Sequence, residues 1–248
     1  MQWTTVNIRL KTFGTGSMTR TTTERKMDKM AEKKCGVIAI VGRPNVGKST
    51  LTNALVGEKI AIVSPKPQTT RNRITGVVNG PWGQMVLLDT PGLHRAHNKL
   101  DEYMTQTIRH SVADVDGVLL LVEPVAKLGE AEEELIGRIR DLGVPAALVI
   151  NKIDTVKKED LLAVMALYGG EHKWDAVLPI SARTGEGLDE LKDVAGRWLT
   201  EGPALFPEDM TTDQPERQVC AEILREKLLL CLDKEVPHGT AVELTKFL

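Results

Sequence analysis

The chain has 248 residues, of which 42% are hydrophobic and 27% are charged, and its 32 basic and 34 acidic side chains give a formal net charge of −2. These values exclude a disordered or fibrous chain, and also a strongly basic chain that coats nucleic acid by charge alone. No apolar run approaches the ~20 residues that cross a bilayer. The three cysteines, Cys35, Cys220 and Cys231, are too few and too scattered to predict a disulfide framework or a zinc site. This cysteine content favours a reducing compartment such as the cytoplasm.

Residues 1–34 are predicted to be a disordered or misannotated tail that carries no chemistry. The segment is rich in Thr, Lys and Arg, and Met1–Thr23 contains no acidic residue. This composition faintly resembles an organelle transit peptide, but it has little amphipathic arginine patterning. A disordered tail, or a start codon assigned too early, is the favoured interpretation, because Met18, Met27 and Met30 all precede the first predicted strand.

A strand, a glycine loop and a helix follow in the order that a phosphate-binding loop requires. Cys35–Val41 is a continuous apolar run rich in β-branched residues, which predicts a central parallel strand buried on both faces. It leads into Gly42–Ser49, which fits G-x-x-x-x-G-K-[ST] at every fixed position. The glycines let backbone N–H groups point into one concavity, and the helix predicted over Ser49–Val56 presents its positive end to the same anion. Lys48 would then reach the β- and γ-phosphates, and the Ser49 hydroxyl would ligate Mg²⁺.

A second buried strand, Met85–Leu88, ends in the turn Asp89–Gly92. An aspartate at the carboxyl end of such a strand can hold Mg²⁺ through a water molecule. Gly92 can offer its backbone N–H to the γ-phosphate, because a residue without Cβ allows close approach.

The proline-containing segment Ser64–Arg71 is predicted to be a loop. A threonine in it would complete the Mg²⁺ shell in the triphosphate state and be released after hydrolysis. Thr70 is favoured for this role and Thr69 is its rival, whereas an ordinary surface loop is the alternative interpretation.

The tetrapeptide Asn151–Asp154 follows the predicted strand Ala146–Ile150 and selects the base. The Asp154 carboxylate can accept two hydrogen bonds from guanine, whereas adenine offers no such pair of donors, and an unpaired buried carboxylate is costly. Asn151 is expected to brace the loop, and the Lys152 stem is expected to lie over the ring.

Ser181–Arg183 completes the predicted site, because it follows a further strand, Val177–Ile180, and brings the Ala182 N–H to the guanine O6. Together with the strand predicted at Gly117–Val122, these elements indicate an α/β fold in which a mostly parallel sheet is flanked by helices. Ligands bind at the carboxyl ends of the strands in such sheets.

The carboxyl-terminal part begins after a helix predicted over Leu188–Thr200 and a linker at Gly202–Pro207. Asp213 and Glu216 predict a capping box, and apolar positions at helical spacing predict a helix along Gln218–Leu232. A turn and a strand over Thr240–Leu248 are expected next. The apolar stripe around Ile223 and Leu228 should be poorly packed or docked on the first domain.

These motifs resemble those of the Era family of bacterial GTPases. The resemblance is carried by Gly42–Thr50, Gln68–Arg71, Asp89–Leu93, Asn151–Asp154 and Ser181–Arg183. It implies an Era-type P-loop GTPase domain over residues 35–203, followed at 204–248 by a linker and the first helix and strand of an RNA-binding KH domain of the α+β class. Because the family's G-x-x-G loop would come later, the RNA-binding half is expected to be missing from this chain.

The resemblance implies Mg²⁺-dependent hydrolysis of GTP to GDP and phosphate as a switch in 16S rRNA processing and 30S subunit assembly. The alternative is a regulator that reports the GTP or GDP state with negligible turnover, its RNA binding lost through truncation. Leu93 stands where Ras-like GTPases carry a glutamine that orients water. Several relatives use the residue matching Asn45 to bind K⁺, and simple loop bracing is the equally weighted alternative.

The resemblance further implies a monomeric protein in the cytoplasm. Peripheral association with the inner face of the cell membrane is the alternative location. The expected catalytic residues are Lys48, Thr70 and Gly92, and the expected Mg²⁺ ligands are Ser49, Thr70 and, through water, Asp89. The expected nucleotide-binding residues are Gly42, Asn45, Val46, Gly47, Lys48, Ser49, Thr50, Asp89, Gly92, Asn151, Lys152, Asp154, Ser181, Ala182 and Arg183.

Overall fold

The computed structural model describes residues 34–63, 74–89, 115–231 and 241–245. Thr69, Thr70, Gly92, Leu93 and nearly all of the expected tail therefore lie outside the described residues. The chain divides into a unit of residues Met1–Glu32 and a unit of residues Lys33–Leu248, and all described residues belong to the second.

The described residues form seven strands, five α-helices and one 3₁₀ helix. The strands are β1 (Lys34–Gly42), β2 (Ile74–Gly80), β3 (Gly83–Asp89), β4 (Gly117–Val122), β5 (Ala146–Ile150), β6 (Ala176–Pro179) and β7 (Thr200–Glu201). The helices are α2 (Lys48–Val56), α4 (Glu130–Leu142), η1 (Ile153–Thr155), α5 (Lys158–Gly169), α6 (Leu188–Gly196) and α7 (Glu216–Cys231). In these ranges, no helix combines the length and the apolar character needed to cross a membrane.

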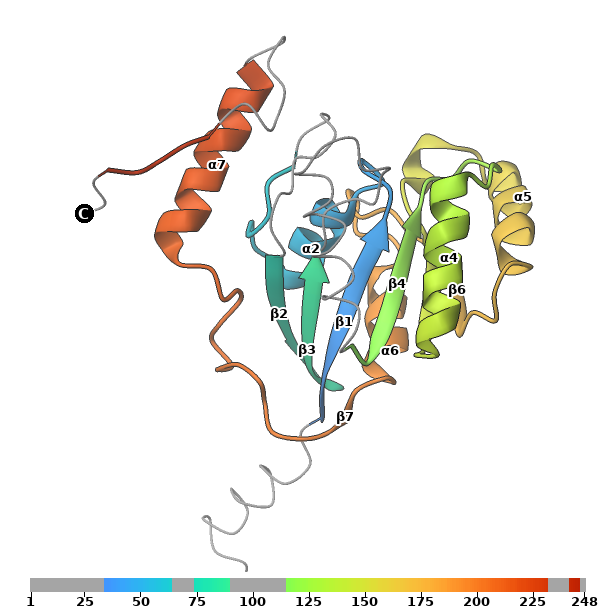
Figure 1. The fold of residues 1–248 in the computed structure, drawn as a ribbon, viewed down its shortest axis with the longest axis horizontal. Coiled ribbons are helices and arrows are strands. Elements are labelled where there is room, and N and C mark those ends of the chain that lie inside the picture. The colour runs from blue at the N-terminus through green and yellow to red at the C-terminus, as the bar shows by residue number, and fades with distance from the viewer. Residues whose placement is uncertain (1–33, 64–73, 90–114, 232–240, 246–248) are drawn as a thin grey trace, which may run out of the picture. The chain divides into compact units, whose positions relative to one another are not determined.

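The strands form one mixed sheet in the order β2-β3-β1-β4-β5-β6, and the short strand β7 pairs with β1 (Figure 1). The pairs β1–β3, β1–β4, β4–β5 and β5–β6 are parallel, whereas β2 and β7 run antiparallel to their partners. The prediction of a mostly parallel sheet flanked by helices is therefore confirmed. Since these parallel strands point the same way, β1, β3, β4, β5 and β6 all end at one edge of the sheet.

Strand β1 is buried on both faces because its successive side chains enter two different hydrophobic clusters. Ile38 and Ile40 pack on the face that α2 and α6 cover, with Leu51 and Leu191 among their neighbours. Ala39 and Val41 belong to the cluster that includes side chains of α4 and α5. Figure 1 shows α4 and α6 on opposite faces of the sheet. This two-sided burial explains why the strand is a continuous apolar run rather than an alternating one.

Three elements differ from the sequence-based expectations. Helix α6 ends at Gly196 instead of Thr200, because Thr200 and Glu201 pair with Cys35 and Lys34 of β1. Helix α7 begins at Glu216, and the Pro215 carbonyl accepts the first backbone bonds, so Asp213 lies too early to cap it. The described residues 241–245 of the expected last strand have no regular structure. Strand β2 and helices α4 and α5 had no sequence-based prediction.

The segment after β7 runs along the sheet edge formed by β2. The buried Gln84 side chain exchanges two hydrogen bonds of 2.8 Å with the Phe206 backbone. Farther along, the Val77 N–H donates to the Thr211 carbonyl at 2.9 Å. Helix α7 contacts the loop after α2 through Glu226, whose carboxylate accepts from Lys59 Nζ at 2.6 Å and from the Val63 N–H at 3.2 Å.

On α7, the side chains of Leu224, Leu228 and Leu230 are exposed. In the expected stripe around Ile223 and Leu228, Leu228 is exposed and Ile223 is half-buried, while α7 also contacts the loop after α2 through Glu226. Whether the segment belongs to a KH domain stays a prediction.

Candidate functional site

The phosphate-binding loop starts where β1 ends, between two neighbouring strands that enclose it. The parallel register pairs Ile40 with Asp89 on β3 and Gly42 with Leu121 on β4. Gly42 has φ +155°, and a Cβ there would lie 2.5 Å from the Leu121 carbonyl oxygen. Gly47 has φ +101°, and a Cβ there would collide with the Asn151 side-chain amide. Both fixed glycines of the motif are therefore required by backbone conformation and by space.

Lys48 and Asp89 form a buried pair of opposite charge at the floor of the loop. Lys48 is the first residue of α2, and its Nζ donates to the carbonyls of Gly42 at 3.0 Å and Arg43 at 2.8 Å. Burial lowers the pKa of Lys48 to about 8, against the opposing effect of Asp89. Burial also raises the pKa of Asp89 to about 6, against the opposing effects of Lys48 and then of the Ser49 hydroxyl. Loss of hydration is the largest cause of both pKa shifts, since each charged group is fully buried.

The surroundings of Asp89 fit a divalent cation. The residue is fully buried, and among the residues that the structure describes no donor makes a well-formed hydrogen bond to either carboxylate oxygen, although the Ser49 hydroxyl lies near enough to lower its pKa. A buried carboxylate without partners is costly unless an ion or ordered water compensates it. Hydroxyl and carboxylate oxygens are the ligands that Mg²⁺ prefers. Ser49 and Asp89 are therefore suited to hold Mg²⁺, as the sequence predicts.

Asn151 ties the phosphate-binding loop to the loop after β6. Its buried side chain donates from Nδ2 to the Val46 carbonyl at 2.9 Å, and its Oδ1 accepts from the Ala182 N–H at 2.9 Å. The expected bracing role thus extends over two loops. The Ala182 N–H already donates to Asn151 Oδ1. A bond from this N–H to the guanine O6 stays a prediction, and the two acceptors would have to share the one donor.

Asp154 is held as an ionised acceptor by two neighbours from the loop after β6. The Ser181 hydroxyl donates to its Oδ1 at 2.6 Å, and Arg183 Nη2 lies 2.6 Å from its Oδ2. The hydrogen bond from Ser181 is the main cause that lowers the pKa of Asp154, and the charge of Arg183 adds to it. An ionised carboxylate at this position can accept the N–H groups on one edge of guanine, which is the chemistry predicted for it.

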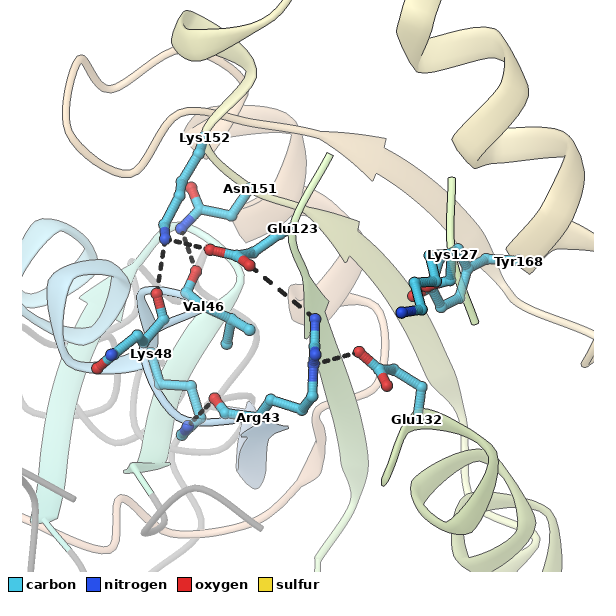
Figure 2. A network of polar contacts seen from close by, with 10 residues as sticks. Arg43, Val46, Lys48, Glu123, Lys127, Glu132, Asn151, Lys152 and Tyr168 are labelled. Atoms are coloured by element: carbon cyan, nitrogen blue, oxygen red, sulfur yellow. Dashed lines mark hydrogen bonds and ion pairs between the residues drawn. The ribbon is translucent and has the colours of Figure 1, made fainter. Parts of the chain in front are cut away.

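Lys152 crosses from the loop after β5 to the phosphate-binding loop, where its Nζ donates to the Asn45 carbonyl at 2.7 Å and to Glu123 Oε1 at 2.5 Å (Figure 2). Glu123 Oε2 lies 3.9 Å from Arg43 Nη2, and Arg43 also forms an ion pair with Glu132. Sequence reasoning missed Glu123, Glu132 and the role of Arg43. The sequence did contain one indication of Glu123: it directly follows the strand β4 and therefore lies at the same sheet edge as the predicted residues.

The remaining predicted residues that the structure describes lie at the same edge. Val46 is buried in the loop, and Ser49 and Thr50 are half-buried in the first turn of α2. That turn carries no acidic side chain, which leaves the positive end of the helix available to an anion. The roles expected of Thr70 and Gly92 fall outside the described residues.

Comparison with known proteins shows which family has this arrangement. Residues 37–152 match the family model described as 50S ribosome-binding GTPase. The chain is 45% identical over 214 residues to GTPase Era of Ruminiclostridium cellulolyticum, covering 86% of this chain and 72% of that protein. It is 47% identical to GTPase Era of Geobacter metallireducens with the same coverage. The chain belongs to the Era family of GTPases. Like the family, it hydrolyses GTP, which favours the enzyme over the alternative of a regulator with negligible turnover.

Two solved Era structures share the fold of this Era-family GTPase. One is Era in complex with MgGDPNP and nucleotides 1506–1542 of 16S ribosomal RNA, 40% identical, with a TM-score of 0.78 over 83% of this chain and 70% of that one. The other is an Aquifex aeolicus Era variant bound to GDP·AlF₄⁻, 40% identical, with a TM-score of 0.77 over 82% of this chain and 70% of that one. The predicted family, fold and GTPase activity are confirmed, whereas the roles of single residues stay predictions.

Proposed function

We propose that this Era-family GTPase is a GTP-driven switch that acts on 16S rRNA during rRNA processing and 30S subunit assembly. The observation that carries the proposal is the likeness to the Era structure that contains MgGDPNP and nucleotides 1506–1542 of 16S ribosomal RNA. The matching family model is described as 50S ribosome-binding, but it covers only residues 37–152. Sedimentation with purified 30S and 50S subunits therefore decides which subunit the protein binds.

The nucleotide would lie along the sheet edge, with its phosphates at Gly42–Ser49 and its guanine at Asp154. Lys48 would place its positive charge on the β- and γ-phosphates, and burial makes that charge effective because little water screens it. Ser49 and Asp89 would hold Mg²⁺ together with Thr70, and the ion would supply charge neutralisation for the phosphates. Gly92 would offer its N–H to the γ-phosphate. None of these residues has to act as a general base, since phosphoryl transfer proceeds by positioning and charge stabilisation.

We also propose that K⁺ assists at Asn45, as the resemblance implies. Asn45 is one of the two described non-glycine residues with positive φ, at +64°, and Lys152 holds its carbonyl. Such a fixed backbone position is suited to present the Asn45 side chain at one place beside the phosphates. Phosphate release measured in K⁺ and in Na⁺ buffers tests this role, and equal turnover in both would contradict it. The cytoplasmic location, the peripheral membrane association and the monomeric state stay predictions.

The function is tested by titrating the full chain, loaded with GDPNP, against an RNA with the sequence of nucleotides 1506–1542. The GDP-loaded chain and an RNA of the same composition in scrambled order are the controls. We expect saturable binding that depends on the RNA sequence and is stronger with GDPNP than with GDP, which requires that RNA recognition does not rest on the family's G-x-x-G loop alone. Sedimentation with purified 30S and 50S subunits should give co-migration with 30S. Absence of saturable RNA binding, or co-migration with 50S alone, would overturn the proposed role.

A further inference from the structure

Glu123 lies at the junction of two loops that the nucleotide has to bridge. It is the first residue after β4 (Gly117–Val122), so the strand end places it beside the loops that follow β1 and β5. Its two carboxylate oxygens face different partners, Lys152 Nζ at 2.5 Å and Arg43 Nη2 at 3.9 Å (Figure 2). One carboxylate therefore connects the base-recognition loop with the phosphate-binding loop.

The partners of Glu123 are themselves fixed. Lys152 Nζ also donates to the Asn45 carbonyl at 2.7 Å, which leaves the ammonium held between a carboxylate and the phosphate-binding loop. Arg43 is paired on its other side with Glu132 of α4, whose side chain is only 3% exposed. Since α4 packs on the sheet through Leu135 and Ile139, that anchor is rigid.

Without the Glu123 carboxylate, Lys152 Nζ would keep only its contact with the neutral Asn45 carbonyl, so its long side chain would be held less firmly in one rotamer. Charge-assisted hydrogen bonds are stronger than neutral ones, so loss of the carboxylate charge removes the stronger of the two contacts. The Asn45 carbonyl would then lose a well-placed donor, in a residue whose φ of +64° is uncommon outside glycine, although asparagine adopts it more readily than most residues. The loop would be less well ordered before the nucleotide arrives.

We propose that Glu123 is a positioning residue for guanine-nucleotide binding. Its carboxylate holds Lys152 against the phosphate-binding loop and also contacts Arg43 of that loop. It does not touch the nucleotide but fixes the two loops that do. The inference rests on the nucleotide-binding role proposed above. Ordering these loops in advance lowers the entropy that binding would otherwise have to overcome, so the effect should appear in affinity.

The test is Glu123→Gln in the full chain, which keeps the shape and removes the charge. We expect the dissociation constant for fluorescently labelled GDP to rise about three- to fivefold, through faster dissociation, because the three side chains are partly exposed and an ion pair of this kind is of modest strength. At saturating GTP, kcat should stay within about twofold of wild type. Glu134→Gln is the matched control, since it removes an ion pair with Arg138 within α4, and it should leave GDP affinity unchanged.

Two further measurements separate positioning from a general structural role. The thermal midpoint of the nucleotide-free Glu123→Gln variant should match that of wild type. In a Lys152→Met background, Glu123→Gln should cost less GDP affinity than in wild type, because the Lys152 contact is already gone and only the longer contact with Arg43 remains. Unchanged affinity of the single variant, or an equal loss in both backgrounds, would overturn the inference alone. A wild-type chain without affinity for GDP would overturn the proposed nucleotide site and this inference with it.

Discussion

The two ends of the nucleotide site differ in how far the protein satisfies its own polar groups. At the phosphate end, Lys48 and Asp89 are buried, and in the described part of the chain both Asp89 oxygens lack well-formed hydrogen bonds. At the base end, Asn151 and Asp154 are bonded to Val46, Ala182, Ser181 and Arg183. The phosphate end is therefore built for charges that a ligand brings, whereas the base end is organised in advance.

The largest effect is expected at the phosphate end. Lys48→Ala should lower kcat for GTP hydrolysis by about 1000-fold or more, because no other side chain would replace the buried charge that we propose acts on the phosphates. Phosphate release under saturating GTP measures it. Lys192→Ala is the control, since Lys192 pairs with the exposed Asp189 on α6 and should behave as wild type. A Lys48 variant with turnover within about tenfold of wild type would contradict the view that the phosphate end depends on this buried charge.

The next effect concerns the preorganised end. Asn151→Ala should lower the free energy of unfolding by about 3 kcal/mol, since the Val46 carbonyl and the Ala182 N–H both lose a buried partner. Urea unfolding without nucleotide measures this loss. Asn79→Ala is the comparison. Asn79 donates to the Glu208 carbonyl in an exposed place and accepts from Gln84 Nε2, which keeps the Phe206 carbonyl as a second partner, so about 1 kcal/mol is expected there. Equal losses in both variants would argue against advance organisation by Asn151.

Asp154→Asn should weaken GDP binding about 30-fold, because one charged acceptor for guanine becomes a donor. Binding of ATP should hardly change, so the preference for GTP over ATP should fall by a similar factor. Competition against labelled GDP measures both nucleotides. A preference equal to that of wild type would remove the assignment of the base to this carboxylate.

The smallest effect separates the two partners of Asp154. Arg183 is 76% exposed, so Arg183→Ala should change GDP affinity by no more than about twofold. Ser181 is buried, and Ser181→Ala should cost about fivefold because its hydroxyl donates directly to the carboxylate. A loss of affinity in Arg183→Ala larger than in Ser181→Ala would indicate that Arg183 contacts the nucleotide itself.

Elements with a strong local pattern could be predicted from the sequence, and elements that depend on distant partners could not. Strands β4 and β5 have the predicted bounds, since a fully buried apolar run has few alternative structures. Thr200 is predicted to end a helix, but it pairs with Cys35 of β1 as part of a short strand. Lys152 and Asn45 are 107 residues apart, and no local pattern predicts such a contact.

By itself, the sequence determined the kind of chemistry, because motifs such as Gly42–Ser49 and Asn151–Asp154 place particular side chains and glycines at spacings that only a nucleotide site requires. Only the tertiary structure decided how these loops are held together, through the Asn151 bridge and the contacts of Glu123 with Lys152 and Arg43. The physical reason is that motif chemistry is local, whereas a hydrogen bond or ion pair between loops depends on strand order and register, which are set by packing of the whole sheet.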